Sequence, residues 1–172
     1  MTTTTNRKGS AVVTLPTDTQ IKIVRVFDAP AALLYKAHTT AELVRKWWCG
    51  DDDEWLVCDI DLRVGGSWRW VFRHTNESGS FEVPFHGTYL ELDPPTRYVY
   101  TEVFEAAPIP DPDEGATTNT VTFDEVDGVT TMTVVTECPN QFVRDAIIES
   151  GMEGGMQLSY DRMEDVAKSL AS

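Results

Sequence analysis

The chain has 172 residues, with 14 Lys and Arg against 28 Asp and Glu, which gives a formal net charge of -14 at pH 7. This length suits one domain with a substantial apolar core. The negative charge repels phosphate backbones and anionic membrane surfaces, and every apolar run is shorter than the 18 or so residues that a membrane span needs. We therefore expect neither a nucleic-acid partner nor a membrane partner.

The three cysteines, Cys49, Cys58 and Cys138, are odd in number and have no CxxC spacing. No secretory leader is recognised, so we expect reduced, structural thiols and a cytoplasmic protein. The first ten residues, MTTTTNRKGS, are polar and show no periodicity. They predict a disordered lead over residues 1–10, followed by a single domain over residues 11–172.

The first part of the domain predicts two strands and two short helices. Residues 11–15 form an expected edge strand, and QIKIVRVF, residues 20–27, alternates β-branched residues as a strand does. Pro30 suits the start of a helix over AALLYKAHTT, and Thr40 is placed to cap a second helix, AELVRKWW. The order is thus strand, strand, helix, helix.

Residues 55–137 change to a period of two, which predicts successive antiparallel hairpins. Leu90 and Leu92 break the alternation that ends at Tyr89, so we expect a β-bulge near Gly87. Asp127-Gly128 is a favourable two-residue hairpin turn. The expected strands contain WLVCDIDLR, SWRWVFRH, FEVPFHGTYLEL, TRYVYTEVFE, NTVTFDEV and VTTMTVVTE.

The C-terminal stretch from Pro139 to Leu170 predicts one long amphipathic helix. Its apolar residues recur at steps of three and four, which places them on one helical face. Gly151, Gly154 and Gly155 interrupt this pattern, and glycine weakens a helix interior. We expect these glycines where the helix bends or where the sheet backbone approaches it.

Five sequence segments in this order resemble the helix-grip superfamily called SRPBCC, which is also described as START-like or birch-pollen-allergen-like. Within it, they resemble the group named after the activator of the 90-kDa heat-shock protein ATPase and the polyketide cyclase-like domains. The segments are RVFDAPAALLYKAHT with ELVRKWW, VCDIDLRVGGSWRWV, GTYLELDPPTRYVYTE, VTFDEVDGVTTMTV and SGMEGGMQLSYDRMEDV.

The resemblance implies an α+β fold in which a curved antiparallel sheet of about six or seven strands wraps around the long C-terminal helix. A cavity lies between sheet and helix in lipid, hormone and polyketide binders of this superfamily. The resemblance implies no fixed catalytic residue. The eukaryotic co-chaperone of the group carries a further N-terminal domain, where this chain has a short polar lead, so we do not expect a chaperone partner.

The alternating strand faces and the helix predict a set of cavity-lining residues. For Trp70 and Phe72, lining and core packing are equally favoured, whereas for Trp47 and Trp48 core packing is favoured. For Met152 and Met156 core packing is also favoured, although a thioether suits a pocket wall as well. The predicted lining residues are Trp68, Trp70, Phe72, Phe85, Tyr89, Tyr100, Met132, Val134, Met152, Met156 and Tyr160.

No motif assigns a catalytic group, a metal site or a cofactor. His38, His74 and His86 lack metal-ligand spacing, and the acidic run at residues 51–54 lacks the bend glycine of a calcium loop. Among groups that could act as an acid or base, the candidates are His86, Tyr100 and Glu102, with Tyr89 and Tyr160 as further proton donors. For His86 a surface role is favoured.

The leading prediction is a non-catalytic protein that binds a small, largely apolar molecule between the sheet and the C-terminal helix. The first alternative is an enzyme of the polyketide cyclase or dehydratase type, a lyase-like reaction that uses polar groups in the cavity. The second is an interaction protein, either a chaperone partner or a homodimer that pairs an exposed sheet edge.

Overall fold

A computed structural model describes residues 6–107 and 109–171, and it contains one antiparallel sheet of eight strands with four α-helices. The α+β class is as predicted, and the strand number is slightly higher than expected. The elements are β1 Val12–Thr14, β2 Gln20–Phe27, α1 Ala31–Thr39, α2 Ala41–Trp47, β3 Glu54–Ile60, β4 Ser67–Asn76, β5 Gly79–Asp93, β6 Arg97–Phe104, the 3-10 helix η1 Pro112–Gly115, β7 Thr117–Val126, β8 Val129–Glu137, α3 Gln141–Glu149 and α4 Met152–Leu170.

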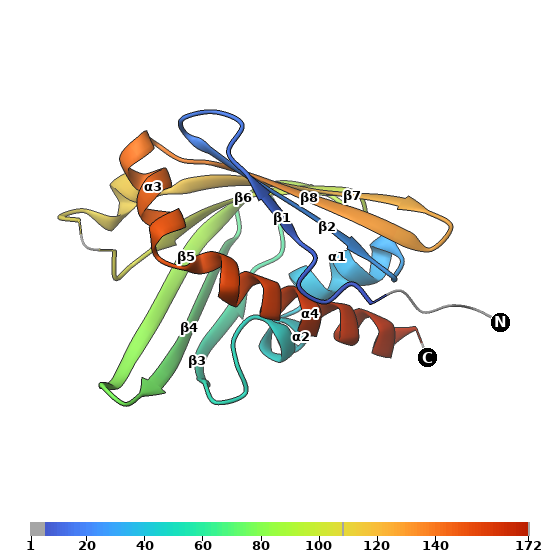
Figure 1. The fold of residues 1–172 in the computed structure, drawn as a ribbon, viewed down its shortest axis with the longest axis horizontal. Helices are drawn as coiled ribbons and strands as arrows, with labels where there is room; N and C mark the ends of the chain where they lie inside the picture. The colour runs from blue at the N-terminus through green and yellow to red at the C-terminus, as the bar shows by residue number, and fades with distance from the viewer. Residues whose placement is uncertain (1–5, 108, 172) are drawn as a thin grey trace.

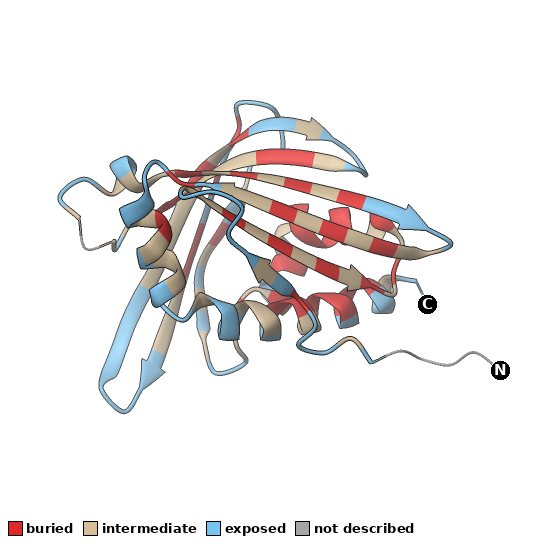
Figure 2. Cartoon of the chain, turned by 45° about the horizontal axis from the view of Figure 1, so that its top comes forward, coloured by how far each residue is buried: buried red, intermediate tan, exposed pale blue. Residues whose placement is uncertain are grey.

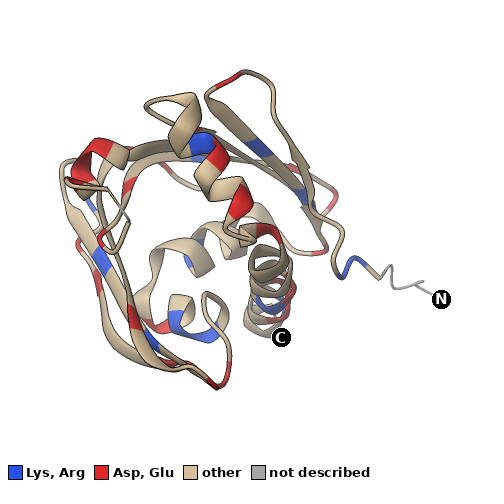
Figure 3. Ribbon diagram, turned by 60° about the vertical axis from the view of Figure 1, so that its left-hand side comes forward, with Lys and Arg blue, Asp and Glu red and all other residues tan. Residues whose placement is uncertain are grey.

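The strands lie in the order β1-β2-β8-β7-β6-β5-β4-β3, so that β2 pairs with β8 and the rest form a meander. The sheet curves around α4, which lies across its concave side together with α1 and α2 (Figure 1). Figure 3 looks nearly along α4 and shows the strands bending around these helices. This is the helix-grip arrangement that the family resemblance implies.

The core lies between the concave face of the sheet and the helices. Along β2 every second residue is buried, and Figure 2 shows the same alternation along the neighbouring strands. One of the buried positions of β2 is charged. Arg25 is 1% exposed and its Nη2 lies 3.0 Å from Asp161 and 3.1 Å from Glu164, so it ties β2 to α4.

The bulge that we predicted near Gly87 lies elsewhere. The β4–β5 register runs without a break through Gly87, and the shift occurs between Tyr89 and Glu91 where β5 pairs with β6. Gly87 has another reason to be glycine: a Cβ there would lie 1.8 Å from the carbonyl oxygen of Thr101 on β6. The bulge adds one residue to β5, so that Leu90 and Glu91 are both exposed in succession and Leu92 is half-buried.

The single C-terminal helix that we predicted is two helices. Helix α3 ends at Glu149 and α4 begins at Met152, with Gly151 at a φ of 81°, a conformation that favours glycine. The expectation for Gly151 is therefore confirmed. It is wrong for Gly154 and Gly155, which lie exposed within α4, where a Cβ would meet nothing within 4 Å beyond the backbone of its own helix.

The other predicted elements agree closely with the structure. Thr40 occupies the N-cap position of α2, although its side chain makes no capping hydrogen bond, and Asp127-Gly128 joins β7 to β8. Residues 1–5 of the predicted lead lie outside the described residues. In the rest of the lead, the Gly9 N–H donates to Asp161 at 3.0 Å and Arg7 pairs with Asp28 at 3.0 Å, so this part has defined contacts.

The three cysteines are free and buried. Across the described helices, none combines the length and apolar character required to span a membrane.

Candidate functional site: an aromatic cavity between sheet and helices

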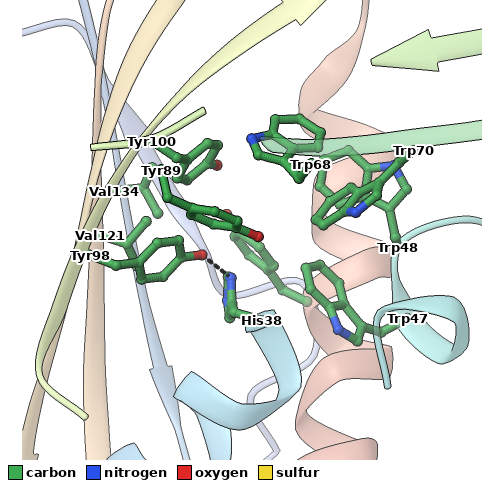
Figure 4. A pocket seen from close by; sticks show the side chains of 11 residues that line it. His38, Trp47, Trp48, Trp68, Trp70, Tyr89, Tyr98, Tyr100, Val121 and Val134 are labelled. Atoms are coloured by element: carbon green, nitrogen blue, oxygen red, sulfur yellow. Dashed lines mark hydrogen bonds between the residues drawn. The ribbon is translucent and has the colours of Figure 1, made fainter. Parts of the chain in front are cut away.

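A cavity of about 40 Å³ lies between the concave face of the sheet and the helices. This is room for about three water molecules. Eight of its eleven lining residues are Trp or Tyr. Figure 4 shows these side chains facing one another across the cavity: His38, Trp47, Trp48, Trp68, Trp70, Tyr89, Tyr98, Tyr100, Val121 and Val134, with Tyr160 as the eleventh lining residue.

One wall comes from the central strands. Tyr98 and Tyr100 are two residues apart on β6, so their side chains share a face, and their rings stack at 5.4 Å with an interplanar angle of 17°. Tyr89 of β5 pairs directly with Tyr100, and Val121 of β7 pairs directly with Tyr98. The register of three strands therefore brings these side chains to one place on the sheet.

The other wall is formed by tryptophans from β4 and from the end of α2. Trp68 and Trp70 alternate on the inward face of β4 with ring centroids 4.8 Å apart, and Trp48 meets Trp70 edge-on at 4.9 Å. Trp47 is 1% exposed, whereas Trp48 is only half-buried. Trp48 is thus the least buried of the four tryptophans in the wall.

The tyrosines of the cavity are uncharged at neutral pH. Burial raises the pKa of Tyr89 and Tyr160, and raises those of Tyr98 and Tyr100 well above the usual range. The hydroxyl groups of Tyr89, Tyr100 and Tyr160 make no hydrogen bond to any other described residue. Neutral hydroxyls that protein groups do not satisfy are available to a molecule inside the cavity.

His38 of α1 is 8% exposed and is surrounded by aromatic rings. Its Nδ1 lies 2.6 Å from the Tyr98 hydroxyl, and its ring contacts those of Trp47 and Phe123 at 5.0 and 5.5 Å. Burial lowers the pKa of His38 to about 3, because no carboxylate offsets the loss of water around an imidazolium. His38 is therefore neutral at physiological pH.

A polar strip continues from the cavity along β6, β7 and β8. Glu102 follows Tyr98 and Tyr100 on the same face of β6, and Thr117 pairs with it from β7. Asn119 donates to Thr117 at 3.1 Å and accepts from Thr136 at 2.6 Å. The Glu102 carboxyl has no hydrogen-bond partner among the described residues, and burial raises its pKa to about 7.

The structure brings together six of the eleven residues that the sequence predicts as cavity lining: Trp68, Trp70, Tyr89, Tyr100, Val134 and Tyr160. The other five lie nearby but do not line this cavity. Met132 is fully buried in the core. Phe72 packs against Trp55, and Phe85 packs against Trp48. Met152 and Met156 are half-buried on the first turns of α4.

Of the three acid or base candidates, Tyr100 lines the cavity and Glu102 lies beside it. His86 does not reach the cavity. Its Nδ1 is 3.1 Å from Glu105 and its Nε2 is 3.5 Å from Asp113, and 40% of its side chain is exposed. The structure thus places His86 on the surface, where the sequence favoured it.

Five lining residues were not predicted: His38, Trp47, Trp48, Tyr98 and Val121. Tyr98 and Val121 could have been found from the sequence, because each continues the alternating pattern of its strand. His38, Trp47 and Trp48 could not, since the two short helices contain no signal for the direction in which they pack against the sheet.

No group of three or more potential metal ligands occurs among residues 6–107 and 109–171. The acidic run at residues 51–54 makes local contacts: Asp53 accepts from the Gly50 N–H at 2.9 Å and lies 2.6 Å from His74 Nδ1.

Most of the chain matches the profile of one protein family. Residues 28–168 match the profile of the family described as Activator of Hsp90 ATPase homolog 1-like protein. None of the curated proteins compared with the chain matches it.

Several solved structures share the fold over most of the chain. A protein from Chromobacterium violaceum is 26% identical with a TM-score of 0.72, covering 88% of this chain and 98% of that one. A protein from Rhodobacter sphaeroides is 21% identical with a TM-score of 0.79, covering 92% and 99%. A structure described as an HSP90 activator from Plasmodium falciparum is 21% identical with a TM-score of 0.62, covering 86% and 95%. These similarities confirm the predicted helix-grip fold.

Proposed function

Because this chain belongs to the Activator of Hsp90 ATPase homolog 1-like family and keeps an aromatic cavity inside its helix-grip fold, we propose that it binds a small, largely apolar molecule there. The observation that carries this proposal is the composition of the cavity wall. Eight Trp and Tyr side chains surround a space that no protein group fills.

Unfilled space and unpaired polar atoms both lower the stability of a protein core. Buried polar atoms without partners cost free energy, and two such atoms, Nε2 of His38 and Nε1 of Trp70, belong to the wall of this cavity. Aromatic walls offer ring faces and edges to a flat ligand, and neutral tyrosine hydroxyls can donate to it or accept from it. The wall therefore suits a ligand better than it suits packing alone.

The ligand requires more room than the present cavity of about 40 Å³. Ligand pockets commonly enclose about 300 Å³ or more, so a wall side chain must move when the ligand enters. Trp48 of the wall is half-buried, as are Met152 and Met156, which pack against the same core cluster from α4. We expect entry between the end of α2 and the first turns of α4.

Binding is tested with purified protein and a panel of one-ring and two-ring aromatic compounds, by thermal shift and native mass spectrometry. The Val134→Phe variant adds a ring inside the cavity, whereas Val135→Phe adds the same ring on the opposite face of β8. We expect the wild type and Val135→Phe to bind and Val134→Phe to lose binding. Equal binding by both variants would place the ligand elsewhere, and no binding by the wild type would refute the proposal.

The second candidate is an enzyme that moves protons on the bound molecule. It is favoured by Glu102, whose pKa of about 7 suits a group that accepts and releases a proton at neutral pH. Tyr100 lies on the same face of β6 and remains protonated. Glu102→Gln should abolish any turnover of a cyclisable substrate while leaving its affinity within about threefold. Unchanged turnover would remove Glu102 from this role.

The third candidate, an interaction with a chaperone, is favoured by the family description and by the similarity to the Plasmodium falciparum structure described as an HSP90 activator. The test is an ATPase assay of the cognate 90-kDa chaperone with and without the chain. A stimulation that saturates with concentration would support this function, and an unchanged rate would exclude it.

A further inference from the structure

One tryptophan in the cavity wall has an indole N–H without an acceptor. The indole N–H groups of Trp47, Trp55 and Trp68 donate to backbone carbonyl oxygens at 2.9, 3.1 and 3.2 Å. Trp70 is 7% exposed, and its Nε1 is fully enclosed with no hydrogen-bond partner. Since an indole nitrogen can only donate, Trp70 presents a buried, unsatisfied donor.

His38 provides a second, independent polar atom of the same kind. Its Nε2 is also enclosed and has no partner, while its Nδ1 is 2.6 Å from the Tyr98 hydroxyl. If Tyr98 donates to Nδ1, then Nε2 carries the hydrogen of the neutral ring. If instead Nδ1 carried the hydrogen and donated to the Tyr98 oxygen, Nε2 would be an unpaired acceptor and the Tyr98 hydroxyl hydrogen would also lack an acceptor. We therefore assign the hydrogen of the imidazole ring to Nε2.

Both atoms belong to residues that line the cavity (Figure 4). Only one other side-chain atom in the described part of the chain is buried without a partner, and that is Nε of Arg25, whose guanidinium is held by carboxylates of α4. Buried polar groups in proteins are nearly always paired, so an unpaired group marks a place that a water, an ion or a ligand can complete. The two unpaired donors in the cavity therefore indicate an acceptor on the ligand.

We propose that the cavity selects a flat aromatic molecule that carries a hydrogen-bond acceptor oxygen, as in a cyclic aromatic ketone, and that the Trp70 indole N–H donates to this oxygen. The aromatic part of the molecule is recognised by the rings of Trp68, Trp48 and the tyrosines. This inference rests on the proposed function, because it names the chemical class of the ligand for the same cavity.

The test compares 1-indanone with indane, which share one bicyclic skeleton and differ in a carbonyl oxygen. Dissociation constants of both are measured for the wild type, for Trp70→Phe and for Trp68→Phe. Trp68→Phe is the matched control, because it removes an indole from the same strand face whose N–H is already bound to a carbonyl oxygen. The quantity of interest is the affinity ratio of ketone to hydrocarbon.

We expect Trp70→Phe to lower this ratio by about tenfold and Trp68→Phe to change it by less than about twofold. An unchanged ratio in Trp70→Phe would overturn the inference and leave the proposed function standing. The same conclusion would follow if both variants changed the ratio equally. If neither compound binds the wild type up to its solubility limit, the proposed function and this inference both fail.

A second measurement does not depend on the folding of a variant. In the wild type with nitrogen-15 tryptophan, the Trp70 Nε1–H resonance is assigned by its nuclear Overhauser effects to the ring of Trp68; the centroids of the two rings are 4.8 Å apart. We expect a downfield shift with 1-indanone and none with indane. The centroids of the Trp48 and Trp70 rings are 4.9 Å apart, and if the Trp48 ring already satisfies this N–H, both compounds will leave the resonance unmoved and the inference is refuted.

Discussion

The buried neutral His38 makes a strong prediction about stability and pH. In the unfolded chain its pKa has the ordinary value of 6.5, whereas in the folded protein burial lowers it to about 3. The unfolded chain therefore takes up a proton first as the pH falls. The stability that His38 contributes is fully present above pH 6.5 and is lost progressively as the pH falls toward 3.

The magnitude follows from the shift. Each pH unit within this window costs about 1.4 kcal/mol, so His38 should account for a loss of about 2 kcal/mol between roughly pH 6.5 and pH 4.5. Other groups titrate in the same range, and a variant is needed to isolate the histidine. His38→Gln keeps an acceptor for the Tyr98 hydroxyl but does not titrate.

The assay is urea unfolding of wild type and His38→Gln at several pH values across the window. The difference in unfolding free energy between them should shrink by about 2 kcal/mol from pH 6.5 to pH 4.5. In the control, His86→Gln, the corresponding change should stay below about 1 kcal/mol, as for an exposed ion pair. If the His38→Gln difference varied by less than about 0.5 kcal/mol, the account of His38 as a buried neutral ring would be wrong.

Three further predictions concern stability. Gly87→Ala should destabilise the fold by about 3 kcal/mol, because its Cβ would collide with a carbonyl group of β6. Gly155→Ala lies in open space on α4 and should stabilise the fold by up to about 1 kcal/mol. If thermal unfolding showed the same effect for the two variants, both predictions would be contradicted. Arg25→Ala should cost about 3 kcal/mol in urea unfolding because it removes the buried countercharge of Glu164, which keeps only the Asp28 N–H and the part-exposed Lys168 as partners; a loss below about 1 kcal/mol would show that the pair is dispensable. Burial raises the pKa of Glu102 to about 7, so its carboxylate destabilises the fold once it ionises above that pH, and Gln cannot ionise. Glu102→Gln should therefore raise the unfolding free energy by about 2 kcal/mol above pH 7 and by much less near pH 4.5. A gain that is independent of pH would refute that cause.

Much of the fold could be predicted from local patterns. The strand Gln20–Phe27, the turn at Asp127-Gly128 and the inward face of Trp68 and Trp70 depend on alternation and turn chemistry, which act over a few residues. The apolar face of the C-terminal helix is equally clear. These features were determined by the sequence because neighbouring residues alone impose them.

Tertiary contacts decided what local patterns could not. Nothing near Gly87 in the sequence indicates that the carbonyl oxygen of Thr101 lies against it, and the alternation of β2 does not reveal that the buried Arg25 meets carboxylates more than a hundred residues away. Gly151 and Gly155 look alike in sequence, yet only the packing of α3 and α4 requires the first to be glycine.

The cavity shows the same division. The sequence by itself determined that aromatic side chains alternate on the inward faces of the strands, since a strand points every second side chain to the same side. Only the tertiary structure decided that His38, Trp47 and Trp48 from the short helices close this space, and that the Trp70 N–H is left without an acceptor while the Trp68 N–H has one. The physical reason is that helix docking and hydrogen-bond satisfaction depend on residues distant in sequence, whose relative positions are fixed when the sheet curves around α4.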